Sequence, residues 1–313
     1  MIRLLAPVVF VALWSTGWVV AGIVIPHASP LAFLILRYVC AIALLAPIAF
    51  ALKAHWPSEG RVWAHALVNG ALLHGVYLGG VWWAIEHGVP SGVSALIAAL
   101  QPLFTALVAG PLVGERLGLK KGLGVALGMA GVAAVVAPKL AGVDAIPAWP
   151  VAINVLAMLA VTAATLHQKR SLVGVDLRAL AVVQYLGALV FTVPVAAFAE
   201  PIRFAMTLET GFALAWSVIA LSIVAIFLML AMVERGEVSR MSALIFLVPP
   251  LAAIQAYVAF GERFSAIQMV GMALAALGVL LVNAQAPAPS AEGCIAANGL
   301  DDEDGSETLR RQA

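Results

Sequence analysis

The chain has 313 residues, of which 63% are hydrophobic and 11% are charged, and its mean hydropathy is +1.05. An ordinary soluble domain carries roughly 25% charged residues, so this composition excludes that class and indicates an all-α integral membrane protein. The formal net charge of +1 argues against nucleic acid as a partner, and two cysteines do not suggest a disulfide framework.

Charges and clusters of proline and glycine divide the chain into ten apolar segments. Each is close to the roughly 20 residues that cross a hydrocarbon core, and the connections are too short to hold a soluble domain. The first segment is uncharged for longer than the apolar region of a signal peptide, so we expect it to be retained. The predicted spans are residues 4–25, 31–52, 62–85, 90–112, 118–138, 148–168, 178–199, 212–233, 239–260 and 265–284.

The first span carries two tryptophans far from its ends. Trp14 and Trp18 share one helix face, and Ser15 lies beside them. Tryptophan in a membrane span is more often an interfacial anchor than a ligand contact. The depth of this pair in its segment favours an aromatic wall for a planar or apolar solute, so all three residues are candidate substrate contacts.

The second span contains a cation well inside the apolar segment. Arg37 lies seven residues after Pro30, which is about 10 Å along a helix and a costly depth for an unpaired charge. It could extend its charged end to the interface, tie backbone carbonyls together, or bind a substrate carboxylate.

The third span contributes Asn69, His74 and Tyr77. His74 is the only histidine far from a span end, so it could bind a carboxylate or titrate during a transport cycle. A neutral imidazole hydrogen-bonded between helices is the structural alternative. Tyr77 extends the predicted aromatic wall.

Polar stripes mark the fourth and sixth spans, and polar residues inside a membrane usually face the bundle interior or a wet cavity. Hydrogen bonding between helices without any solute is the alternative. Three residues of these stripes, Gln101, Asn154 and Thr162, are candidate substrate contacts. The stripes consist of Ser94, Ala98, Gln101 and Thr105 in one span, and Asn154, Met158, Thr162 and Thr165 in the other.

Small residues line one face of the fifth span and one face of the tenth. Such faces permit close helix approach, so we expect these two spans to pack together or to form a homodimer contact. No strand precedes the glycines, which excludes a nucleotide-binding loop. The residues are Gly124, Gly128 and Gly131 in the fifth span and Gly271, Ala275 and Gly278 in the tenth.

About half of the chain is duplicated. Residues 91–118 return as 239–265, and both copies read Ser-Ala-Leu-Ile, then proline, then Gly-Glu-Arg. The predicted units are residues 3–138 and 148–284. Each holds five spans, an odd number, so the second unit enters the membrane inverted and a central cavity is expected between the two. A bundle that merely grew by duplication is the alternative.

The distribution of lysine and arginine predicts that both termini face the cytoplasm. Eleven basic residues fall on the side of the N-terminus and three on the other. The first group is Arg3, Lys53, Arg61, Arg116, Lys120, Lys121, Lys169, Arg170, Arg178, Arg235 and Arg240, and the second is Lys139, Arg203 and Arg263.

No predicted span contains aspartate or glutamate away from its ends. A membrane carboxylate is the usual proton relay and the usual counter-charge for a cationic drug. Its absence favours neutral or zwitterionic solutes and facilitative or weakly coupled movement. Glu115 and Glu262, in the repeated Gly-Glu-Arg, are expected to cap helix ends. No pattern suggests a catalytic, cofactor or metal site, so we do not expect an enzyme.

Three patterns together resemble a known family. They are Leu13-Trp14-Ser15-Thr16-Gly17-Trp18, Pro30 with Arg37, and the duplicated Pro102…Gly114-Glu115-Arg116…Gly131. Over residues 3–284 the chain is similar to the ten-helix EamA-type members of the drug/metabolite transporter superfamily, and among them to the YddG-type amino-acid exporters of bacterial inner membranes. The resemblance implies spans 1, 3, 4, 6, 8 and 9 around a central cavity, with spans 5 and 10 packed at one end.

The leading hypothesis is therefore export of amino acids, including aromatic and hydrophobic ones, by a monomer or by a homodimer through the fifth and tenth spans. Sugars, nucleotide sugars and cationic compounds are rival solutes. Nucleotide sugars would require a basic cavity, and cationic compounds would require an acidic one. A lipid-modifying membrane enzyme is the rival from another class, and its candidate motifs are Glu86-His87 and Glu234-Arg235-Gly236-Glu237.

Residues 285–313 differ from the rest, because residues 285–293 are rich in proline and alanine and residues 301–307 form an acidic run. Such a segment is expected to form a disordered cytoplasmic tail. A chain that ends at Asn283 should therefore transport its solute at the rate of the full chain. Uptake by proteoliposomes made with equal amounts of each protein measures this, and loss of transport in the short chain would refute it.

Overall fold

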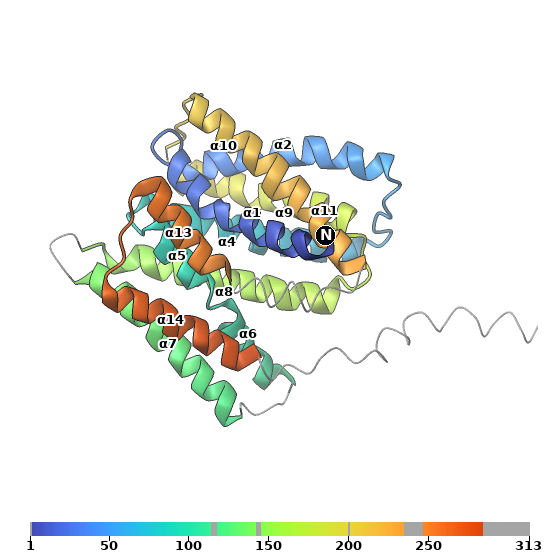
Figure 1. Ribbon diagram of the computed structural model, residues 1–313. Coiled ribbons are helices and arrows are strands. Elements are labelled where there is room, and N and C mark those ends of the chain that lie inside the picture. Colours follow the sequence, from blue (N-terminus) through green and yellow to red (C-terminus); the bar gives the residue numbers. More distant parts are fainter. Residues whose placement is uncertain (1, 114–117, 142–144, 200, 235–246, 284–313) are drawn as a thin grey trace, which may run out of the picture.

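The computed structural model describes residues 2–113, 118–141, 145–199, 201–234 and 247–283 (Figure 1). Helices make up the described chain apart from short connections and one isolated antiparallel bridge between Ala28 and Phe204, which confirms the predicted all-α class. The predicted tail and Glu115 lie outside the described residues.

The first half contains α1 (Ile2–Val24), α2 (Pro30–Ala51), α3 (Gly60–Gly70), the π-helix η1 (Ala71–Val76), α4 (Tyr77–Glu86), α5 (Ser91–Ala98), α6 (Gln101–Val113) and α7 (Leu119–Leu140). The second half contains α8 (Ala148–Ser171), α9 (Leu177–Ala199), α10 (Leu208–Val218), the π-helix η2 (Ile219–Val224), α11 (Ala225–Glu234), α13 (Val248–Phe260) and α14 (Ala266–Asn283).

Five of the described helical stretches are long and apolar enough to cross a membrane. They are Pro30–Ala51, Leu119–Leu140, Ala148–Ser171, Leu177–Ala199 and Leu208–Met232. Shorter apolar helices occupy Val8–Val24, Ser91–Thr105, Val248–Phe260 and Ala266–Val282. All lie at positions where the sequence predicts spans, and the predicted ninth span is described only from residue 247.

The third span of each half changes from α-helix to π-helix and back at the same relative place. Both π-helices have six residues, and η2 follows η1 by 148 residues at each end. The same offset relates Glu86, at the end of α4, to Glu234, at the end of α11. The duplication therefore includes a backbone irregularity that the sequence did not reveal.

Helices α7 and α14 lie side by side at one edge of the bundle (Figure 1). A Cβ atom built on Gly278 would lie 2.4 Å from the backbone nitrogen of Gly128, and one on Gly131 would lie 2.5 Å from the carbonyl oxygen of Gly271. The predicted small-residue faces are thus used inside the chain, where they let the two backbones touch.

A second close approach joins α3 to α9. Cβ atoms added at Gly70 and Gly187 would meet the carbonyl oxygens of Gln184 and Leu67 at 1.9 Å and 2.0 Å. Any side chain at either glycine would force these helices apart. Gly70 and Gly187 do not belong to a stripe of small residues on their helices, so the sequence did not indicate this contact.

One end of the bundle is tied together across the two halves. The carboxylate of Glu262 accepts hydrogen bonds from the backbone N–H groups of Ser91 and Gly92, at 2.9 Å and 3.1 Å. Glu262 therefore caps a helix, but this helix is α5 of the other half and not the helix that follows Glu262 in the chain. Nearby, Arg203 donates to Glu86 at 2.8 Å.

At the opposite end, Asp176 holds the connection between α2 and α3 against the start of α9. It accepts from the backbone N–H of His55 at 3.1 Å, while Arg178 donates both to Asp176 and to the Leu52 carbonyl. The hydrogen bond from the Arg178 side chain lowers the pKa of Asp176 to about 2. Because that pKa is depressed, the stabilisation exists above the usual aspartate range and is lost only as the pH falls toward 2.

The contact between α7 and α14 gives a test with a matched control on one helix. Replacing Gly131 by leucine forces overlap with α14 and should destabilise the fold by about 1–3 kcal/mol, the usual range for overpacking. Replacing Gly122 by leucine meets no atom within 4 Å and should have little effect. Thermal unfolding in detergent measures both, and equal melting temperatures for the two variants would contradict the packing.

Candidate functional site

Two cavities meet between the halves of the bundle. The larger has a volume of about 700 Å³ and the smaller about 220 Å³. Trp14 and Trp18 of α1 and Tyr77 of α4 line both of them. These three aromatic side chains therefore form the shared boundary of one composite space.

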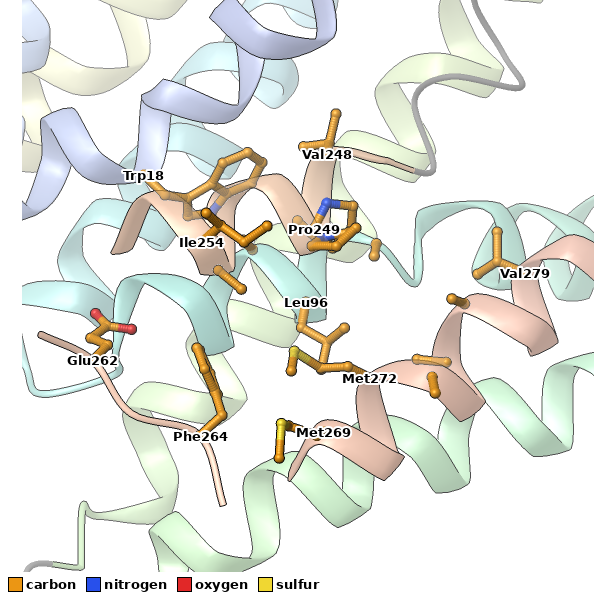
Figure 2. A pocket seen from close by; sticks show the side chains of 18 of the residues that line it. Trp18, Leu96, Val248, Pro249, Ile254, Glu262, Phe264, Met269, Met272 and Val279 are labelled. Atoms are coloured by element: carbon orange, nitrogen blue, oxygen red, sulfur yellow. The ribbon is translucent and has the colours of Figure 1, made fainter. Parts of the chain in front are cut away.

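The larger cavity is bordered by α5 and α6 from the first half and by α13 and α14 from the second. Figure 2 shows Leu96, Phe264 and Met272 directed toward the same space. Its lining is mainly apolar. Pro102 and Pro249, which occupy corresponding places in the duplication, both contribute.

The turn between α5 and α6 explains how the first half presents this wall. Pro102 is the second residue of α6, in the first turn of the helix, where the N–H group that proline lacks has no intrahelical partner to lose. The chain turns at Ala99 and Leu100, and the Leu100 N–H bonds to the Ile97 carbonyl at 3.1 Å. Ala99 in this turn and Gln101 directly after it line the larger cavity.

The smaller cavity is lined by several polar side chains. Arg37, His74, Gln168, Gln184 and Tyr185 line it. Gln184 occupies the place in the second half that corresponds to Arg37 in the first, at an offset of 147 residues. Equivalent positions of the two halves therefore face one space, as inverted units around a common axis should place them.

Five of the nine predicted contacts line a cavity, and four do not. Trp14, Trp18 and Tyr77 line both cavities, Gln101 lines the larger and His74 the smaller. Ser15, Asn69, Asn154 and Thr162 border neither, and all four are buried.

The two predicted asparagines hold helices together. Asn69 donates to the Ala164 carbonyl and accepts from Gln184, both at 2.7 Å, which joins α3, α8 and α9. Asn154 donates to the hydroxyl of Ser94 at 2.9 Å and joins α8 to α5. These are the interhelical hydrogen bonds that the sequence left open as the alternative to solute binding.

The hydroxyl candidates are also engaged. Ser15 accepts from the Gln255 amide at 2.9 Å, which joins α1 to α13, and Thr162 donates to a carbonyl of its own helix at 3.0 Å. Gln101 donates to Thr165 at 2.9 Å while still lining the larger cavity. It can therefore meet a solute without losing its tie to α8.

Several lining residues were not among the predicted contacts. Gln168 and Tyr185 carry no sequence signal, because a lone glutamine near a span end and a lone tyrosine are common in membrane helices. Phe264 and Met272 are apolar and cannot be separated by type from lipid-facing residues. Gln184 could have been found, since it is the repeat counterpart of Arg37.

Within the described residues, no group of three or more histidine, cysteine, aspartate or glutamate side chains is placed to hold a metal ion. The residues that line the cavities offer aromatic, amide and guanidinium groups for direct contact with an organic molecule.

The EamA-like transporter family matches residues 2–137 and 148–284, and no curated protein matches the chain. A solved structure described only as "Crystal structure of protein" is 20% identical, with a TM-score of 0.63 over 90% of this chain and 97% of that one. That likeness supports the fold alone. Because the family matches both halves, the chain belongs to the EamA-like transporters and is a multi-pass membrane transporter of the drug/metabolite superfamily.

Proposed function

We propose that this transporter exports amino acids, including hydrophobic and aromatic ones, across a bacterial inner membrane by alternating access. The supporting observation is the larger cavity, which lies between the inverted halves and is walled by Trp14, Trp18 and Tyr77. Rocking of one half against the other would expose such a space to each side in turn. The YddG-type exporters are the subgroup that this proposal assigns.

The size and lining of the cavity suit a compact molecule with an apolar side chain. Its volume of about 700 Å³ lies within the roughly 300–1,000 Å³ typical of small-molecule sites. Aromatic faces and the methionines Met269 and Met272 offer adaptable apolar contact. A sugar would leave most of its hydroxyl groups without partners against this wall.

The charges that line the cavities favour amino acids over cationic solutes. Among the described residues that line either cavity, Glu262 is the only carboxylate. Both of its oxygens already accept backbone hydrogen bonds from α5. A cationic drug would therefore lack a free counter-charge, whereas a zwitterion brings its own.

The same scarcity of carboxylates favours a facilitative or weakly coupled mechanism, because proton relays in membranes usually use aspartate or glutamate. The surplus of basic residues beside the N-terminus favours cytoplasmic termini. The chain acts as a monomer, or as a homodimer through surfaces of α7 and α14 that their mutual packing leaves open.

Trp18 and Trp149 provide a matched pair of tryptophans for a test. Trp18 is buried and lines both cavities, while Trp149 is half exposed at the start of α8 and packs on Trp83. Replacing Trp18 by alanine should lower the exchange rate of labelled leucine and phenylalanine about tenfold, equivalent to about 1.4 kcal/mol. Replacing Trp149 by alanine should leave the rate near that of the wild type.

Counterflow into proteoliposomes loaded with unlabelled amino acid measures these rates, with and without a pH gradient. Failure of the wild type to move any amino acid faster than protein-free vesicles would rule out the assigned solute. A large dependence on the pH gradient would rule out the facilitative mechanism. An equal loss of exchange rate in both tryptophan variants would contradict a role for the cavity in binding the amino acid.

A further inference from the structure

Arg37 is a buried cation without a counter-charge in the described part of the protein. Its side chain is 6% exposed, and neither of the two ion pairs among the described residues includes it. Its one hydrogen bond joins Nη2 to the Ser222 hydroxyl at 3.4 Å, and its Nε atom is buried without a partner. A guanidinium can donate five hydrogen bonds, so most of its capacity is unused.

Two more unpartnered polar atoms border the same small space. The indole Nε1 of Trp18 and the Nδ1 of His74 are both buried without hydrogen-bond partners, and both residues line the smaller cavity with Arg37. The indole is a donor only, and the imidazole nitrogen donates in one of its tautomers. A ligand that accepts hydrogen bonds would satisfy all three of these atoms, which share one cavity.

Helix α2 places this group between the two irregular spans. Arg37 bonds to Ser222 on η2, and the adjacent Tyr38 hydroxyl donates to the backbone carbonyl of His74 on η1 at 2.8 Å. His74 and Ser222 hold corresponding places in the two π-helices, 148 residues apart. Such helices often occur at functional sites, and here the two are bonded to consecutive residues of α2.

We propose that the smaller cavity is a carboxylate-binding subsite, with Arg37 as the charged donor and Trp18 and His74 as its neighbours. The proposal rests on the proposed function and names the part of the substrate held here. A carboxylate accepts the paired hydrogen bonds that a guanidinium offers. The rest of the substrate extends past Trp14, Trp18 and Tyr77 into the larger, apolar cavity.

This arrangement fits a ligand better than a structural tie. A tie would use Arg37 to join helices through several bonds, yet it makes one long hydrogen bond to a neutral hydroxyl. The volume of about 220 Å³ next to it leaves room for a carboxyl group. Its counterpart Gln184 lines the same space with a neutral amide, so the two halves supply one positive charge between them.

A pair of probes of similar length and opposite charge tests the subsite without requiring transport. 3-Phenylpropionate ends in a carboxylate, and 3-phenylpropylamine ends in a CH2–NH3+ group at the same place. Each is added to the purified protein and the thermal unfolding temperature is measured, because a ligand that binds the folded state raises it. We expect the acid to stabilise the wild-type protein and the amine to leave it unchanged.

Three variants connect this preference to Arg37. Arg37→Gln should abolish stabilisation by the acid. Arg37→Lys, which keeps the charge but loses the paired donors, should weaken acid binding about tenfold. Arg203→Gln, which removes an arginine from the exposed pair with Glu86, should behave as the wild type.

The outcomes separate the subsite from the proposed function. If the wild type binds both probes equally, or Arg37→Lys binds the acid as tightly as the wild type, the subsite is wrong even when amino acids are transported. Stabilisation by the acid that disappears in Arg37→Gln and weakens in Arg37→Lys supports it, even when no amino acid crosses the vesicle membrane. If Arg37→Gln does not fold, the two probes on the wild type and the acid on Arg37→Lys still test whether Arg37 binds a carboxylate.

Discussion

A polypeptide inside hydrocarbon must pair its own backbone N–H and C=O groups, and this constraint explains where the chain departs from regular helix. The departures inside the described spans include the turn between α5 and α6 and the π-helices η1 and η2. Each borders one of the two cavities. Irregular backbone is tolerated at membrane depth where protein or a cavity surrounds it, so these breaks and the solute pathway occupy the same places.

The inverted duplication turns one set of local features into a cavity with two unlike ends. Corresponding residues meet across the space, as Pro102 does with Pro249 and Arg37 with Gln184. The second pair has diverged, which leaves Arg37 as the cation of the smaller cavity, beside a larger cavity whose lining is mainly apolar. That asymmetry distinguishes the two ends of a bound molecule, although the scaffold itself is nearly symmetric.

Sequence patterns predicted the features that depend on many residues or on close spacing. The spans, the duplication and the faces that pack α7 on α14 all follow from periodic or repeated residue types. The cavity contacts were predicted less well, because a buried polar residue such as Asn154 looks the same whether it meets a helix or a solute. The π-helices and the approach at Gly70 depend on tertiary packing, which leaves no local signal.

The inversion of the two halves can be measured directly with cysteines placed at Ser58 and Met206. Both residues are exposed, and they lie 148 residues apart. Each belongs to the connection between the second and third spans of its half. The native cysteines are first removed by Cys40→Ala and Cys294→Ser. A single cysteine at position 58 or 206 is then treated with a membrane-impermeant maleimide, in intact cells and in disrupted membranes. We expect the cysteine at 206 to react in intact cells and the one at 58 only after disruption. Reaction of both from the same face of the membrane would contradict the inverted arrangement.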